Sequence, residues 1–184
     1  FAPISIVASV PLIIITSHAA RSVQELIALA RADPGKLTFG SVGIGSVSHV
    51  SGELFNTMAG TRMVHVPYKG GAPAVQAALA GEVAVMFATS LESIGHIKGG
   101  RVRALGITSS KRSPVAPEIP TVSESALPGF EVDAWFGLLA PAATPRAIVD
   151  RLSHEVAWAL DAPEIKRKFA DLSVVPMPTT PDQF

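Results

Sequence analysis

Hydrophobic residues along the middle of the chain alternate between two spacings, one typical of helices and one typical of short buried strands. This alternation predicts strands over 37–40, 63–66, 83–87 and 102–107, and helices over 23–32, 47–58, 72–80 and 90–98. In the second helix the apolar residues share one face, which we expect to be buried. They are Val47, Val50, Leu54 and Met58. Strand–helix units in succession favour an α/β fold with an open sheet and right-handed crossovers.

The two ends of the chain follow other patterns. Residues 4–16 form an apolar, strand-like run that is interrupted by Ser9 and Pro11 and is shorter than the about 18 residues that span a membrane. After residue 108, prolines at 114, 117, 120 and 128 predict an irregular stretch. A strand is expected over 131–139, and its Trp135 and Phe136 are expected in the core.

Two helices are predicted near the C-terminus. Thr144 and Pro145 match the N-cap and the first helical residue of a helix that runs to Leu160. Asp161 is expected to cap a further helix that ends near Leu172.

Composition and charge narrow the classes of function. The chain has 184 residues with 15 basic and 15 acidic side chains, so its formal net charge is zero. This balance excludes the broad basic surface that nucleic-acid binding usually needs. The absence of cysteine excludes disulfides, thiolate zinc sites and a cysteine nucleophile. The five histidines lack the spacing of metal-binding motifs, and we expect neither a metal ion nor a cofactor.

A glycine-rich segment, residues 40–49, joins a predicted strand to a predicted helix. The backbone N–H groups of Gly43, Gly45 and Ser46 can point to one place there, beside the partial positive charge of the helix N-terminus. A hydroxyl from Ser46 or Ser48 can add a further donor. The segment therefore predicts a pocket for a carboxylate or a phosphate, with a tight strand-to-helix turn as the alternative.

Familiar phosphate and nucleophile motifs are missing from this segment. Ser48 stands where a G-x-G-x-x-G motif needs its third glycine, which argues against a dinucleotide site. The segment matches neither a P-loop nor a G-x-S-x-G nucleophile elbow. Ser46 and His49, three residues apart, still leave a small serine hydrolase as a second hypothesis, although the sequence places no carboxylate to orient His49.

Two further loops follow the next two predicted strands. One contains Tyr68, Lys69 and Gly70, and the other contains Thr89 and Ser90; each precedes a predicted helix. Loops that follow neighbouring parallel strands lie side by side at the carboxyl edge of a sheet, where open α/β folds bind ligands. We therefore expect these residues to share an anion-binding edge with the glycine-rich segment. The simpler alternatives are a solvated charge for Lys69 and an N-cap for Ser90.

Blocks of sequence spread along the chain match a known family. They are residues 37–41, 43–49, 65–70, 99–107, 119–122, 135–141, 144–145 and 148–149. The blocks Tyr68-Lys69-Gly70 and Trp135-Phe136-Gly137 are specific. Together, and in this order, the blocks resemble the Bug-type solute-binding proteins, which serve the tripartite tricarboxylate transporters of bacteria.

The resemblance implies an α/β fold of the periplasmic binding protein type II-like class, in which two α/β lobes with parallel-rich sheets are joined by two crossing strands. Residues 14–106 would form the second, ligand-binding lobe, and residues 1–13 and 107–184 would belong to the first lobe. Nothing before Phe1 corresponds to the family's upstream glycine-rich loop, so the first lobe is expected to be incomplete. The chain also departs from its relatives at Ala84 and Ala88, where they commonly carry acidic residues.

The resemblance also implies a function. The protein would be a non-catalytic, monomeric, periplasmic receptor whose precursor carries a signal peptide. It would capture a small organic carboxylate through the loops 43–49 and 68–70 and deliver it to the membrane subunits of the transporter. No nucleic acid, membrane insertion, metal or cofactor is implied. An extracytoplasmic ligand sensor is a third hypothesis beside transport and hydrolysis.

Overall fold

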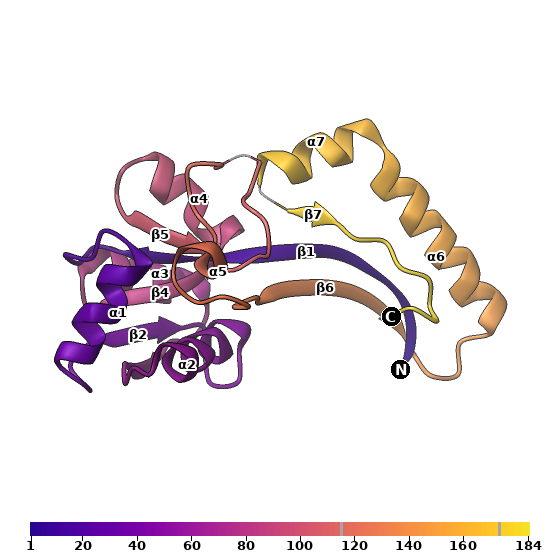
Figure 1. Ribbon diagram of the computed structural model, residues 1–184. Helices are drawn as coiled ribbons and strands as arrows, with labels where there is room; N and C mark the ends of the chain where they lie inside the picture. Colours follow the sequence, from indigo (N-terminus) through magenta and orange to yellow (C-terminus); the bar gives the residue numbers. More distant parts are fainter. Residues whose placement is uncertain (115, 173) are drawn as a thin grey trace. The chain divides into compact units, whose positions relative to one another are not determined.

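The computed structural model describes residues 1–114, 116–172 and 174–184 (Figure 1). The chain divides into two compact units. The central unit comprises Pro11–Asp133, and the terminal unit comprises Phe1–Val10 and Ala134–Phe184. These limits differ from those of the expected lobes, 14–106 and the remainder, and the lobe boundaries stay a prediction.

The central unit is built on an open mixed sheet with the strand order β3-β2-β4-β1-β5. The strand β2 runs parallel to both β3 and β4, whereas β1 lies antiparallel between β4 and β5. The α/β class and the open sheet are therefore confirmed. The expected parallel-rich pairing is limited to β2 with β3 and β4, because β1 runs antiparallel to its neighbours β4, β5 and β7 (Val175–Pro176). The strands are β1 (Ala2–Thr16), β2 (Thr38–Ser41), β3 (Val64–Pro67), β4 (Val85–Thr89) and β5 (Arg103–Ile107).

Helices follow the strands of the central unit much as the sequence predicted. They are α1 (Val23–Ala32), α2 (Val47–Ala59), α3 (Gly71–Ala80), α4 (Ser90–Lys98) and α5 (Val122–Ser125). Gly60 and Gly81 end α2 and α3 in the left-handed conformation, with φ of 61° and 76°, which glycine adopts without steric cost. The short α5 was not predicted, although the capping box of Thr121 and Glu124 marks its start.

Alternate residues of β4 face the helices on opposite sides of the sheet. Phe87 packs edge-on against Phe55 of α2, whereas Met86 belongs to the buried cluster that contains Ala74 and Ala78 of α3. Because neighbouring residues of a strand point to opposite faces, α2 and α3 cover opposite faces of the sheet. Both faces of β4 are therefore buried, which explains why its sequence is almost continuously apolar.

The buried face of α2 is not the one that the hydrophobic pattern indicated. Val50 and Met58 are 52% and 38% exposed, and the buried residues lie on an adjacent face. Gly52 lies so close to the Phe39 ring that a side chain at this position would overlap it, and this close approach turns the face of α2 that contains Gly52 inward. The buried residues of α2 are Ser48, Ser51, Gly52, Phe55, Asn56 and Ala59.

The terminal unit contains β6 (Asp133–Ala140), β7 (Val175–Pro176), α6 (Arg146–Asp161) and α7 (Pro163–Asp171). Both of its strands pair with β1. Its buried cluster is small and consists of Ile4, Ala140 and Val149, with Ala2 packed against it. No residue of α7 is buried.

Three expectations for the terminal unit are wrong. Trp135 and Phe136 are 58% and 51% exposed rather than part of a core. Pro145, and not Thr144, occupies the N-cap position of α6, which begins at Arg146. Asp161 is the last residue of α6, so it does not cap α7. Within the described residues, no helix is both long and apolar enough to cross a bilayer.

Candidate functional site

The three predicted site loops lie at one edge of the central unit's sheet. Ser41 at the end of β2 pairs with Pro67 at the end of β3, and Gly40 pairs with Met86 of β4. Because the three strands are parallel, the loops that follow them start from the same edge, and each leads into the N-terminus of α2, α3 or α4. The structure therefore brings the glycine-rich segment, residues 68–70 and residues 89–90 to a common edge.

The glycine-rich segment is held by hydrogen bonds within itself. The Gly43 N–H donates to Ser41 Oγ at 3.1 Å, and the Gly45 N–H donates to His49 Nδ1 at 3.1 Å. The Ser46 N–H donates to the Gly43 carbonyl at 3.2 Å. An anion that uses these three predicted donors must therefore compete with partners that the loop already supplies.

The serines of the segment fix the start of α2. The Ser46 hydroxyl donates to the Gly43 carbonyl at 2.6 Å and accepts the His49 N–H at 3.4 Å, as an N-cap residue does. Ser48 is buried, and its Oγ accepts the Val42 N–H at 3.0 Å. Among the described residues, the N–H groups of Val47 and Ser48 have no recorded partner. These first-turn donors, aided by the helix dipole, are the part of the edge that is open to an anion.

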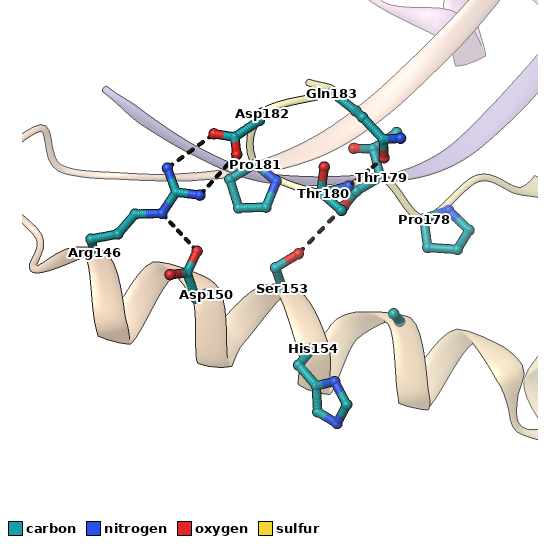
Figure 2. Close-up of a pocket in the computed structure, with 11 residues that line it drawn as sticks. Arg146, Asp150, Ser153, His154, Pro178, Thr179, Thr180, Pro181, Asp182 and Gln183 are labelled. Carbon is teal, nitrogen blue, oxygen red and sulfur yellow. Dashed lines mark hydrogen bonds and ion pairs between the residues drawn. The ribbon is translucent and has the colours of Figure 1, made fainter.

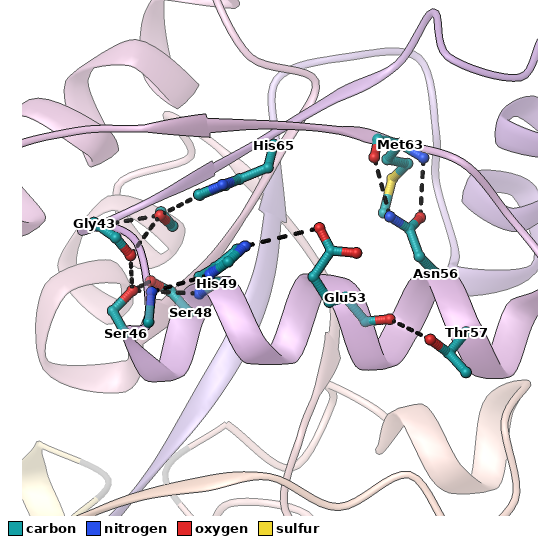
Figure 3. Close-up of polar contacts among 11 residues, drawn as sticks. Gly43, Ser46, Ser48, His49, Glu53, Asn56, Thr57, Met63 and His65 are labelled. Carbon is teal, nitrogen blue, oxygen red and sulfur yellow. Dashed lines mark hydrogen bonds and ion pairs between the residues drawn. The ribbon is translucent and has the colours of Figure 1, made fainter.

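Two histidines stack against each other beside this loop (Figure 3). The ring centroids of His49 and His65 are 3.9 Å apart with an interplanar angle of 19°, and the Phe39 ring lies 5.0 Å from that of His65. His65 Nε2 lies 2.6 Å from Ser41 Oγ, and His49 Nε2 lies 3.8 Å from Glu53 Oε1. Burial lowers the pKa of His65, the neighbouring His49 lowers it further, and Glu53 opposes both.

His65 was not identified as a site residue from the sequence. It is paired directly with Phe39 in the β2–β3 ladder, so its side chain lies on the same side of the sheet as the Phe39 ring and as α2. Its nearness to His49 depends on that pairing, which spacing along the chain does not encode. The signal that could have found it is its place two residues before the end of β3.

The second loop places Tyr68 against the glycine-rich segment. The Tyr68 N–H donates to the Ser41 carbonyl at 2.9 Å, and a side chain added at Gly43 would come within 3.7 Å of the Tyr68 carbonyl oxygen. Burial raises the pKa of the Tyr68 hydroxyl, with a smaller contribution from Glu82. Lys69 is exposed, and no ion pair is recorded for it within the described part of the chain. Gly70 precedes α3 with φ of 112°, in the region that favours glycine.

The third loop is occupied by a carboxylate of the chain itself. Glu92 Oε2 accepts hydrogen bonds from the N–H and the hydroxyl of Thr89, which makes Thr89 the N-cap of α4 and corrects the assignment of that role to Ser90. Ser90 is fully buried. The Glu92 carboxylate also lies beside Gly71, where a side chain would overlap it. A ligand at this end of the edge therefore meets a negative charge that the sequence did not indicate.

The geometry does not form the nucleophile–base pair of a hydrolase. His49 Nδ1 accepts the Gly45 N–H, and the Ser46 hydroxyl donates to a carbonyl, so no hydrogen bond joins Ser46 Oγ to the imidazole. Glu53 does supply a carboxylate near His49, which was not expected from the sequence. Within the described residues, no group of three or more histidine, cysteine or acidic side chains could hold a metal ion.

A separate cavity of about 510 Å³ lies in the terminal unit, between α6 and the C-terminal segment (Figure 2). Its charged groups are already paired, because Arg146 binds Asp182 with two hydrogen bonds of 3.0 and 3.1 Å and Asp150 with one of 2.7 Å. The Asp182 carboxylate and then Asp150 raise the pKa of Arg146, and Arg146 lowers the pKa of Asp182. These paired charges make the cavity a weaker candidate for an anion than the sheet edge.

Comparisons with known proteins give consistent matches. A family model described as "Tripartite tricarboxylate transporter family receptor" matches residues 1–184. Protein BugT of Bordetella pertussis is 36% identical over 183 residues, which cover 98% of this chain and 56% of BugT.

Two solved structures match the whole chain. The R. palustris protein Rpa4515 with adipate has a TM-score of 0.94 and 34% identity, and the match covers 100% of this chain and 62% of that chain. MatC from Rhodopseudomonas palustris with bound malate has a TM-score of 0.87 and 32% identity, with the same coverage of 100% and 62%. The chain thus spans between half and two thirds of the length of these relatives.

Proposed function

Because the chain belongs to the tripartite tricarboxylate transporter receptor family, we propose that it forms the ligand-binding region of a periplasmic receptor for a small organic carboxylate. Membership also confirms the Bug-type resemblance found in the sequence. The receptor captures its ligand without chemical change and delivers it to the membrane subunits of a tripartite transporter. Periplasmic location and transporter partnership are supported by the family description.

The observation that carries this proposal is the common edge of three parallel strands. There the glycine-rich segment leads into α2, whose first two N–H groups have no recorded partner among the described residues. Backbone N–H groups at a helix N-terminus favour a carboxylate both by hydrogen bonding and by the helix dipole. Lys69, exposed on the neighbouring loop, adds a positive charge near that edge.

The roles of the predicted residues follow from their contacts. Gly43, Gly45 and Ser46 supply backbone donors that the loop releases to the ligand, and Ser48 supplies the N–H of the second helical residue. His49 and Tyr68 hold the loop, and Gly70 adopts the positive φ of 112° with which the next loop enters α3. Thr89 and Ser90 form the end of the sheet edge at the start of α4. The Glu92 carboxylate, which accepts the Thr89 hydroxyl, disfavours a second negative charge there.

The ligand class is supported by the relatives. The structural relatives were solved with small dicarboxylates, Rpa4515 with adipate and MatC with bound malate. We propose the same chemical class here, a small organic acid with at least one ionised carboxylate. The unformed Ser46–His49 pair argues against the hydrolase hypothesis.

Calorimetry on the full-length protein that contains these residues tests the proposal. Adipate and malate are expected to bind, while adipamide, which has the size of adipate but no negative charge, is expected not to bind. Native mass spectrometry of the protein as purified should reveal a retained organic acid. Absence of binding by a panel of small carboxylates, or equal binding of adipate and adipamide, would contradict the proposed function.

A further inference from the structure

Two histidines from different elements both contact the turn formed by residues 41–45 of the glycine-rich segment. His49 of α2 accepts the Gly45 N–H at Nδ1, and His65 of β3 contacts Ser41 Oγ, which in turn accepts the Gly43 N–H. His49 therefore holds Gly45 directly, and His65 holds Gly43 through Ser41. Both glycines carry predicted backbone donors. Figure 3 shows the two rings beside this segment.

The contact with Gly45 defines the protonation state of His49 in this conformation. A nitrogen that accepts an N–H hydrogen bond must present its lone pair, so Nδ1 is unprotonated and the proton of the neutral ring is on Nε2, which faces Glu53. A protonated ring carries hydrogen on both nitrogens and cannot accept the Gly45 N–H. Protonation of His49 therefore breaks the contact that occupies Gly45.

The stack limits the pair to one proton. The ring centroids of His49 and His65 are only 3.9 Å apart, and two imidazolium ions at that distance repel strongly. The charged or titratable groups that act on this pair are the two rings themselves and Glu53 of α2; Phe39 and Ser41 of β2 are uncharged neighbours. Glu53 Oε1 lies 3.8 Å from His49 Nε2, whereas desolvation disfavours a proton on His65, so the first proton is more stable on His49.

We propose that His49 and His65 are positioning residues of the glycine-rich segment, and that the pair takes up one proton when an anion binds there. This inference rests on the proposed function and adds its coupling to pH. In the free protein, neutral His49 keeps the Gly45 N–H occupied. When an anion arrives, protonated His49 releases Gly45, and both the Gly45 N–H and the cationic ring then favour the negative charge.

Linkage sets the direction of the pH effect. An anion near the pair stabilises a proton on it, and by reciprocity that proton strengthens anion binding. The affinity for a carboxylate that stays ionised is therefore expected to rise as the pH falls, by up to about tenfold per pH unit between the pKa of the free pair and that of the bound pair.

The first test needs no ligand. Nuclear magnetic resonance on the full-length protein should show His49 as the neutral Nε2–H tautomer at about pH 7.5. On acidification, the Gly45 amide should shift with the same midpoint as the His49 ring. A ring that is protonated on Nδ1 when neutral, or a Gly45 amide that does not follow the His49 titration, would overturn the positioning role.

The second test measures proton uptake. Calorimetry with adipate in buffers of different ionisation enthalpy should give close to one proton taken up per adipate bound at a pH between the two pKa values. His49→Gln keeps an acceptor for the Gly45 N–H but does not titrate near neutral pH, so binding should become independent of pH. His65→Gln should keep the uptake, because the proton is carried by His49.

His154→Gln, on α6 of the terminal unit, is the matched control and should retain the uptake. Binding of adipate without proton uptake, or with an uptake that His49→Gln leaves intact, overturns the coupling while the proposed function stands. If adipate, malate and sulfate all fail to bind, the proposed function and the coupling fail together. The tautomer measurement still judges the positioning role in that case.

Discussion

The central and terminal units differ in how completely they bury their apolar side chains. Phe39, Phe55 and Phe87 of the central unit are fully buried, and Phe87 packs edge to face against each of the other two. In the terminal unit, Trp158 is 73% exposed and the buried cluster contains one large aliphatic side chain, that of Ile4, beside Val149 and alanines. The candidate site belongs to the unit with the tighter core.

This difference indicates which unit can hold a binding loop in a fixed position. The glycine-rich segment contacts His65 and includes His49. Both rings stack on Phe39, whose own ring packs against Phe87 and close to Gly52. Loops position ligand groups well when rigid elements hold them. The paired charges of the terminal unit rest on exposed side chains and have no such support.

The largest expected effect on stability comes from removing a buried ring of the central unit, and the matching variant removes an exposed ring of the terminal unit. Phe39→Ala should lower the free energy of unfolding by about 3–5 kcal/mol, because it empties a fully buried site and removes the support of His65. Phe136→Ala in the terminal unit should cost about 1 kcal/mol or less, because half of that side chain is already exposed. Urea unfolding measures both, and equal losses would contradict the contrast between the units.

A smaller effect is expected from a single added methyl group. Gly52→Ala should destabilise the protein by about 1–3 kcal/mol, because the new Cβ overlaps the Phe39 ring. Gly95→Ala in α4 is the matched control, since nothing lies within 4 Å of its Cβ position, and it should stabilise by about 0.5–1 kcal/mol. If Gly52→Ala is as stable as the natural protein in thermal unfolding, the packing of α2 on β2 is not as tight as described.

The smallest effect concerns the exposed pair of Arg146 and Asp182. Arg146 lowers the pKa of Asp182 in the folded state, so the pair stabilises the protein above the ordinary carboxyl pKa, and this stability is lost as the pH falls through the lowered value. Because both side chains are exposed, the effect should be slight and should fade in high salt. Asp182→Asn should abolish it, and a pH profile of stability that this variant leaves unchanged would show that the pair contributes nothing.

Local chemistry was predictable from the sequence, whereas long-range packing was not. The caps at Ser22, Gly60 and Gly81 depend only on neighbours within a turn, so the residue types themselves indicate them. The buried face of α2 depends instead on how closely Gly52 approaches a ring of β2, so the hydrophobic pattern alone selected the wrong face. Trp135 was assigned to the core by its residue type, yet it is exposed and lies edge-on to the Phe184 ring.

The candidate site shows the same division. Order along the chain predicted that three loops would meet at one sheet edge, because parallel strands and short crossovers impose it. His65 and Glu92 escaped notice because their places at the edge depend on strand pairing and on the packing of α4 against α3. Internal partners for Gly43 and Gly45 could not be foreseen either, since side chains from two elements supply them.

The binding of a carboxylate at the glycine-rich segment is tested most directly by a titration of the full-length protein with adipate, followed through its backbone amide resonances. We predict the largest shifts at Gly43, Gly45, Val47 and Ser48, and none of comparable size with adipamide. Binding of adipate that leaves these four amides unmoved would contradict this prediction.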